Sequence, residues 1–173
     1  MSDYGEVIGP GSVRFRRVLP GPIERVWQYL TDSDLRGSWL ASGPMQSHAG
    51  GTVTLLFRHQ DLTAHDEAIP EKYRSMENGV TSVYRVTEWE PPRRLAYTWG
   101  THSEVHFELE PKGRDVLLTL THRRLAQRTD MINVSGGWHA HLDVLAEVLR
   151  GESPAPFWSR LESYEREYQE RVR

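Results

Sequence analysis

The chain has 173 residues, a formal charge of −3, six tryptophans, seven tyrosines and no cysteine. This length predicts one domain, which buries roughly 70% of the surface of the unfolded chain. The lack of cysteine excludes disulfides, thiolate metal sites and a cysteine nucleophile, and the small mixed charge argues against nucleic acid as the main partner. No stretch approaches the run of about 18 apolar residues that a membrane span needs. The opening MSDYGEVIGPGS has no basic region followed by an apolar core, so we expect a cytoplasmic protein with no membrane insertion.

The first third of the chain predicts a strand, two helices and a second strand. Residues Ser12–Leu19 alternate apolar and polar side chains, which is typical of a strand with one exposed face. Pro22 is well placed as the first residue of a helix, and apolar residues then recur at helical spacing up to Leu30. The stretch Thr31–Asp34 can end that helix and cap a second, short one that leads to Trp39. After two glycines, the alternating TVTLLFR predicts the next strand.

The middle of the chain predicts a long loop followed by an antiparallel meander. Residues His59–Gly79 are polar and interrupted by Pro70, so we expect a loop with room for one helical turn. Short turns separate the strands that follow, and such short connections imply antiparallel pairing. The predicted strands are Thr81–Trp89, Leu95–Trp99, Ser103–Glu110 and Asp115–His122.

Two amphipathic helices are predicted to end the chain. The first runs from Asn133 to Arg150, and Gly151 ends it. Because Gly136 and Gly137 fall near its start, we expect them to let the helix begin close to the sheet. Pro154 and Pro156 prevent this helix from continuing, so residues 156–172 form a separate helix that docks on its own domain or on a second subunit. Its apolar stripe consists of Trp158, Leu161, Tyr164 and Tyr168.

This order of elements predicts an α+β fold in which a curved antiparallel sheet wraps around a long C-terminal helix, with a short extra helix after it. One helix cannot fill the concave face of such a sheet, so we expect a cavity beside it. We expect a single domain over residues 1–173, with a core from 12 to 151, a polar insertion from 59 to 79 and the tail helix from 156 to 172.

Four blocks of the sequence resemble the START-like, or SRPBCC, helix-grip superfamily, in the branch named after activators of the heat-shock-protein-90 ATPase. The blocks are PIERVWQYLTDSDLRGSWL, HAGGTVTLLF, VTEWEPPRRLAYTW and GGWHAHLDVLAEVL. The resemblance covers about Val13 to Gly151 and implies a sheet that grips a long helix, with a mostly apolar pocket between them. Members of the superfamily bind hydrophobic small molecules, act as cyclases or dehydratases, or assist the chaperone. The chaperone role also implies a link to the stress response.

Aromatic side chains on neighbouring strands and at the start of the long helix are the candidates for a pocket lining. Tyr84, Tyr97 and His141 could supply the few polar contacts that orient a mostly apolar ligand. Core packing is the alternative role, and the two roles overlap because the wall of such a pocket is also core. The candidate ligand-binding residues are Trp39, Phe57, Tyr84, Tyr97, Trp99, Phe107, Trp138, His141, Leu142 and Leu145.

The histidines do not predict a metal centre. His139 and His141 lie two residues apart on a helix and point about 200° away from each other, so they cannot share a metal. His139 and Asp143 are four residues apart, and we expect them to form a surface pair. The loop HQDLTAHDE contains metal-ligand residue types without the spacing of a known calcium or zinc loop. We therefore expect no metal, no cofactor and no catalytic residue.

Three functions stay open at this point. The leading hypothesis is a binding protein for a hydrophobic or aromatic small molecule. The second is a cyclase or dehydratase that uses pocket histidines and tyrosines as acid and base, which a buried histidine close to a second polar group would favour. The third is a chaperone accessory protein that presents the tail helix and the 59–79 loop, which a flat exposed apolar patch would favour. Each is compatible with a homodimer.

Overall fold

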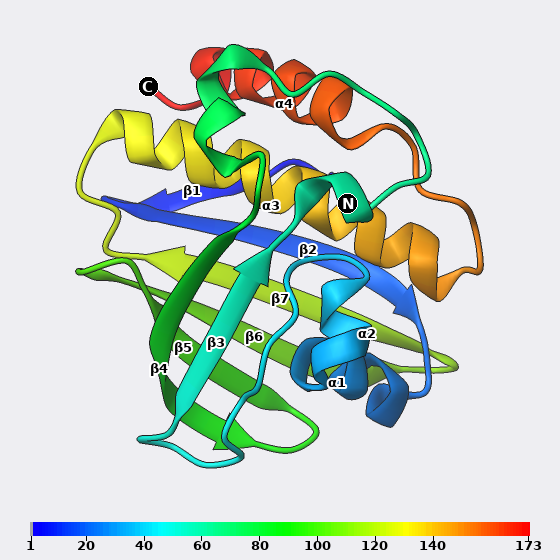
Figure 1. The fold of residues 1–173 in the computed structure, drawn as a ribbon. Helices are drawn as coiled ribbons and strands as arrows, with labels where there is room; N and C mark the ends of the chain where they lie inside the picture. Colours follow the sequence, from blue (N-terminus) through cyan, green and yellow to red (C-terminus); the bar gives the residue numbers. More distant parts are fainter. Residues whose placement is uncertain (1) are drawn as a thin grey trace.

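In the computed structural model, which describes residues 2–173, a seven-stranded antiparallel sheet curves around the long helix α3 (Figure 1). The strand order is β1-β2-β7-β6-β5-β4-β3. The strands are β1 (Glu6–Gly9), β2 (Ser12–Pro20), β3 (Thr52–Phe57), β4 (Val80–Glu90), β5 (Arg94–Trp99), β6 (Ser103–Lys112) and β7 (Asp115–Arg123). The helices are α1 (Ile23–Thr31), α2 (Ser33–Gly37), α3 (Arg128–Leu149) and α4 (Phe157–Arg171), with 3₁₀ helices η1 (His59–Asp61) and η2 (Glu71–Met76).

The predicted helix-grip fold is confirmed, and the local signals that predicted it act as expected. The alternating stretches form strands because their apolar side chains share one face of the pleat, as the burial of Val13, Phe15 and Leu19 on β2 shows. Asp32 caps α2, since its Oδ1 accepts a hydrogen bond from the backbone N–H of Leu35 at 3.0 Å. No helix within residues 2–173 combines the length and the apolar character that crossing a bilayer requires.

Three features differ from the predictions: an added strand, the content of the 59–79 segment and the start of α3. The edge strand β1 is an addition that pairs with β2 through Val7 and Val13; its four residues are too few for a clear alternation. The 59–79 segment holds two 3₁₀ helices where the sequence predicted room for one helical turn. Helix α3 begins at Arg128 instead of Asn133, because Gln127 and Asp130 form a reciprocal capping box one turn earlier than the expected start.

The earlier start of α3 overturns the expected role of its glycines. Gly136 and Gly137 lie inside the helix, not at its start. A Cβ on Gly136 would come within 3.0 Å of Cγ and 3.4 Å of the backbone nitrogen of Glu165 on α4. Gly136 therefore lets α4 approach α3, and it plays no part in bringing the helix to the sheet.

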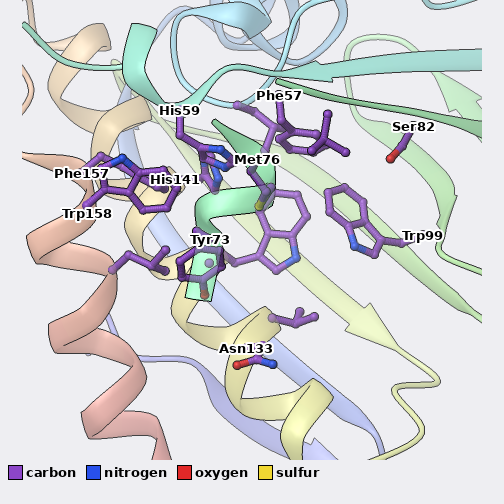
Figure 2. A pocket seen from close by; sticks show the side chains of 16 residues that line it. Phe57, His59, Tyr73, Met76, Ser82, Trp99, Asn133, His141, Phe157 and Trp158 are labelled. Atoms are coloured by element: carbon purple, nitrogen blue, oxygen red, sulfur yellow. The ribbon is translucent and has the colours of Figure 1, made fainter. Parts of the chain in front are cut away.

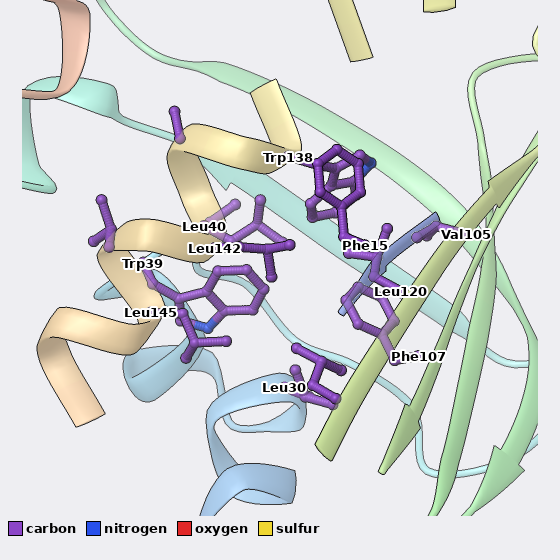
Figure 3. Packing of buried hydrophobic residues seen from close by; sticks show 14 of the residues in the cluster. Phe15, Leu30, Trp39, Leu40, Val105, Phe107, Leu120, Trp138, Leu142 and Leu145 are labelled. Atoms are coloured by element: carbon purple, nitrogen blue, oxygen red, sulfur yellow. The ribbon is translucent and has the colours of Figure 1, made fainter. Parts of the chain in front are cut away.

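The concave face of the sheet is filled along the middle of α3 (Figure 3). Leu142 and Leu145 of the helix are completely buried there. They pack in the same cluster as Trp39 after α2 and Phe107 of β6. Helix α1 closes the far end, where Arg25 donates a hydrogen bond to the carbonyl of Leu149 at 3.1 Å. This part of the molecule is solid core.

The tail helix α4 docks on its own domain, on the side of α3 that faces away from the sheet (Figure 1). Trp158, Leu161 and Tyr168 of its apolar stripe are buried. Tyr164 stacks on His139 of α3 with 3.6 Å between the ring centroids. Arg128 at the start of α3 donates hydrogen bonds to the carbonyls of Gln169 and Val172. The third layer of the fold is thus fixed at both ends of α4.

Candidate functional site

A pocket of about 280 Å³ lies at the N-terminal half of α3, where the sheet edge, the 59–79 segment and the first turns of α4 meet (Figure 2). Its floor is one face of α3 together with the inner side of β3, β4 and β5. The α3 residues recur at helical spacing, which turns them to the same side. The floor consists of Leu40, Phe57, Val80, Ser82, Trp99, Asn133, Val134, Gly137, Trp138 and His141.

The roof of the pocket comes from two segments that the sequence placed outside the shared family pattern. We call His59, Tyr73 and Met76 of the 59–79 segment, together with Phe157, Trp158 and Leu161 of α4, the roof. Tyr73 stacks on Trp158 with a centroid distance of 5.2 Å. The 59–79 segment is therefore part of the site.

Hydrogen bonds tie the two halves of the roof together. The carboxylate of Glu67 accepts from the backbone N–H groups of Trp158 at 2.9 Å and Ser159 at 3.2 Å, so a residue of the 59–79 segment caps the start of α4. Lys72 donates to Asn133 of α3 at 2.8 Å and to Glu165 of α4 at 3.2 Å. Each contact joins residues far apart in the chain.

The structure brings four of the predicted ligand-binding residues to this pocket and leaves the others elsewhere. Phe57, Trp99, Trp138 and His141 line it. Tyr84 packs against Trp99 with a centroid distance of 5.4 Å but is not part of the lining. The other five lie in the solid core, where sheet and helix are already in contact: Trp39, Tyr97, Phe107, Leu142 and Leu145. Whether the four lining residues bind a ligand stays a prediction.

Sequence reasoning missed the whole roof, and in the floor it missed Leu40, Val80, Ser82, Asn133, Val134 and Gly137. Trp158 and Leu161 had been identified as a docking stripe, but nothing in their spacing shows that the stripe also covers a cavity. Tyr73 and Met76 are two of the four large apolar residues of a polar segment, with Leu62 and Ile69, and that contrast is the signal that could have drawn attention to the segment.

A hydrogen-bond chain links the indole of Trp138 to the backbone of Trp99. The indole N–H of Trp138 donates to Nδ1 of His122 at 3.0 Å, and Nε2 of His122 donates to the hydroxyl of Ser103 at 2.8 Å. The Ser103 hydroxyl in turn donates to the carbonyl of Trp99 at 2.5 Å. Burial lowers the pKa of His122 to about 3, so the ring stays neutral and keeps this single tautomer.

Two histidines lie side by side at the other end of the pocket (Figure 2). The ring centroids of His59 and His141 are 5.6 Å apart. His59 is stacked between Phe57, at 5.8 Å, and Phe157, at 5.2 Å. Burial lowers the pKa of His59 to about 4 and that of His141 to about 3, so both rings are neutral at physiological pH.

The predicted surface pair of His139 and Asp143 is buried instead. His139 is 2% exposed because α4 covers it, and its Nδ1 lies 2.9 Å from the hydroxyl of Tyr168. Its Nε2 is 4.0 Å from Asp143. Within residues 2–173, no group of three or more histidine, aspartate or glutamate side chains is arranged to hold a metal ion.

The arrangement suits a neutral, apolar ligand. Among the described residues that line the pocket, none is aspartate, glutamate, lysine or arginine. A histidine with a pKa of 3 to 4 is a weak general base at neutral pH. The pocket can thus enclose an aromatic group, and its histidines are better suited to hydrogen bonding than to proton transfer.

The comparison with protein families decides what this chain is related to. The family model described as "Activator of Hsp90 ATPase homolog 1-like protein" matches residues 20–150. The chain belongs to this family. A protein from Bordetella parapertussis, solved by solution NMR, is 45% identical over 99% of this chain and 91% of its own, with a TM-score of 0.84.

More distantly similar structures show the same fold. CalU16 from Micromonospora echinospora is 23% identical over 98% of this chain and 94% of its own, with a TM-score of 0.68. Aha1 from Colwellia psychrerythraea, solved as a dimer, is 20% identical over 80% of this chain and 95% of its own, with a TM-score of 0.59. No curated protein matches the chain.

Proposed function

We propose that this protein binds a small, planar aromatic molecule in the pocket between the roof and the floor. The observation that carries the proposal is an aromatic-lined cavity of about 280 Å³. Its described lining has no charged side chain, because its two histidines are neutral. A cavity of about 150 Å³ is enough for benzene. The volume therefore suits a ligand of about two fused rings.

The aromatic walls favour a flat ligand over an aliphatic one. Trp99 and Trp138 on the floor have ring centroids 5.2 Å apart and are tilted by 53°. Tyr73 and Trp158 form a stacked pair in the roof. Edge-to-face and offset contacts with such rings add about 0.5–1.5 kcal/mol per pair beyond the buried area.

A buried histidine beside a second polar group, which would favour an acid–base enzyme, is present at His139 and at His122, but neither ring lines the pocket. An acid–base enzyme is disfavoured by the lowered pKa values of His59 and His141. A chaperone accessory would be favoured by a flat apolar patch. The exposed large apolar residues among residues 2–173 are Val7 and Ile8 on β1, Val18 on β2 and Val83 on β4. Val7 and Ile8 point to opposite faces of β1, and three strands separate β2 from β4, so the four do not form one flat patch. A homodimer is compatible with the proposal, and the dimeric Colwellia relative supports testing for one.

Gly137 offers a way to fill the pocket without disturbing the fold. It lies inside α3, lines the pocket, and a Cβ added there meets no atom within 4 Å. We expect equilibrium dialysis with naphthalene to show saturable binding of one molecule per chain. Gly137→Leu should weaken it at least about tenfold, which is about 1.4 kcal/mol. The variant should melt no lower than the parent, because leucine favours a helix over glycine.

Gly137→Ala is the matched control, since a single methyl group gives the same helix preference and leaves most of the volume open. It should keep naphthalene affinity within about twofold of the parent. Native mass spectrometry of freshly purified protein would show whether a natural ligand is retained. Absence of naphthalene binding, or equal binding by Gly137→Leu and the parent, would contradict the proposal.

A further inference from the structure

Some polar atoms that line the pocket already have hydrogen-bond partners in the protein, and others do not. The hydroxyl of Tyr73 donates to Glu165, and the side chain of Asn133 accepts from Lys72. Ser82 lies on β4, far from the histidines in Figure 2. The imidazoles of His59 and His141 lie side by side, and each has a nitrogen left for a ligand. The indole N–H groups of Trp99 and Trp158 in the lining can only donate, so the two histidines are the pair that can offer an acceptor as well.

His141 offers an acceptor. Its Nδ1 lies 2.7 Å from the carbonyl oxygen of Trp39, and a carbonyl can only accept, so Nδ1 carries the hydrogen. The ring is neutral, and Nε2 is therefore a bare lone pair. Nε2 forms no hydrogen bond with residues 2–173, and it is not among the sealed, unpartnered polar atoms. It reaches accessible space at the pocket that His141 lines.

His59 offers a donor. Its Nδ1 is sealed from solvent and has no hydrogen-bond partner among the described residues, because phenylalanine rings stack on both sides of the imidazole. A hydrogen on Nδ1 would be a buried donor without an acceptor, which costs more than a bare nitrogen in the same place. The hydrogen therefore sits on Nε2, which is not sealed.

One chemical group satisfies both rings. A hydroxyl donates one hydrogen bond and accepts others, whereas an ether only accepts and a carboxylate brings a charge. The two ring centroids lie 5.6 Å apart, so one small ligand group that enters beside the rings comes near both, and each hydrogen bond would span about 2.8 Å. With no lysine or arginine in the described lining, a carboxylate or phosphate would be buried without a counter-charge.

We infer that the ligand is a neutral hydroxylated aromatic whose hydroxyl donates to Nε2 of His141 and accepts from Nε2 of His59. This inference rests on the proposed function and names the group that the pocket recognises. His59 and His141 are then the specificity-determining residues, while the aromatic walls supply affinity for any flat ring system.

The test uses four probes of one shape: naphthalene, 2-naphthol, 2-methoxynaphthalene and 2-naphthoate. For the parent protein we expect 2-naphthol to bind at least about tenfold more tightly than 2-methoxynaphthalene, since the ether leaves the His141 acceptor unpaired. The charged 2-naphthoate should bind no better than naphthalene. Equilibrium dialysis of all four against one protein sample gives affinity ratios in which any inactive fraction cancels.

Three variants assign the preference to the two rings. His141→Asn keeps a donor near the position of Nδ1 for the carbonyl of Trp39 and removes Nε2, so it should bring 2-naphthol and 2-methoxynaphthalene within about twofold of each other. His59→Phe keeps the stacked ring and removes the donor, so both oxygenated probes should fall toward naphthalene. Val83→Ala is the control, because this side chain lies on the exposed face of β4 outside the pocket, and it should keep the tenfold preference.

The outcomes separate this inference from the proposed function. If naphthalene binds and the parent does not distinguish 2-naphthol from its methyl ether, the inference is wrong and the proposed function stands. Tightest binding of 2-naphthoate, or loss of the preference in Val83→Ala, would also overturn the inference. If no probe binds, both fail. Should either histidine variant fail to fold, the affinity ratios of the parent alone decide.

Discussion

Trp138 links the core to the pocket, because its ring lines the cavity and packs against the sheet at the same time. It is 3% exposed, as predicted from its place on the apolar stripe of the long helix. Its ring lies 5.8 Å from that of Phe107 in the core and 5.2 Å from that of Trp99 in the pocket. A change at this residue should therefore be felt in stability as well as in binding.

We expect Trp138→Ala to lower the free energy of unfolding by about 3–5 kcal/mol, since it removes a buried ring and leaves His122 without its donor. Urea denaturation followed by circular dichroism measures the change. Val83→Ala is a suitable comparison, because Val83 is 62% exposed and should cost no more than about 0.5 kcal/mol. Equal stability of Trp138→Ala and the parent would show that the ring is not part of the core.

The buried histidines make stability depend on pH in a definite direction. Burial lowers the pKa of His59 to about 4 and those of His122, His139 and His141 to about 3. In the unfolded chain these groups titrate near 6.5, so the unfolded state binds more protons below that pH. Their contribution to stability is complete above about pH 6.5 and is lost as the pH falls toward the folded values.

We therefore expect the free energy of unfolding to decrease steadily as the pH is lowered from about 6.5 to about 4. His59→Phe keeps the stacking and removes one of these groups, so the slope over this range should become shallower by up to one proton. Urea titrations at several pH values provide the measurement. A stability that is constant or rises as the pH falls from 6.5 to 5 would rule this out.

At the scale of elements, two neighbouring glycines of α3 face different surroundings. Gly136 lies against Glu165 of α4, while Gly137 faces the open pocket. We expect Gly137→Ala to stabilise the protein by up to about 1 kcal/mol through helix propensity. Gly136→Ala has the same propensity gain, but its methyl group pushes against α4, so it should be the less stable of the two. Thermal unfolding of both variants gives the order, and the reverse order would disprove the close approach of α4 at Gly136.

The tail helix is the second element whose removal has a predictable result. Deleting residues 152–173 uncovers His139 and opens the pocket, since α4 supplies half of the roof. We expect a lower melting temperature and loss of naphthalene binding. Light scattering on the same samples would reveal any change in subunit number. If the truncated chain keeps the melting temperature, the naphthalene binding and the subunit number of the parent, docking of α4 contributes nothing.

For the whole molecule, the sequence predicts that metal ions play no part in folding. The candidate ligand types of the 59–79 segment have other partners: His59 stacks between phenylalanines, and Glu67 caps α4. We expect chelator treatment to leave the melting temperature unchanged. A fall of several degrees that added zinc or calcium reverses would contradict this.

The fold could be predicted from the sequence because its signals are local. Alternation along β2 and β7 and the helical spacing of α3 each reflect one buried face, and a single face is visible in a window of a few residues. The start of α3 was placed too late because its capping residues precede the apolar stripe. The role of Gly136 was predicted wrongly because its contact is not local: it lies against Glu165, almost thirty positions later in the chain.

The pocket could be predicted only in part, because its position depends on contacts between distant segments. Phe57, Trp99 and Trp138 could be predicted because each lies on the apolar face of its strand or helix. No periodicity shows that the middle of α3 is solid core or that Glu67 binds the start of α4. The roof is the product of such contacts, so its residues become visible only in three dimensions.

The roof also has a consequence for how members of this family diverge. Half of it belongs to α4, which lies beyond residue 150, where the family match ends. The other half is the loop between the edge strand β3 and its neighbour β4, and loops tolerate changes of length and sequence better than the strands they join. Selection for a new ligand can therefore rewrite the roof while the strands and α3 stay as they are. By the same logic, grafting a different loop and tail onto this scaffold is a direct route to engineered binders.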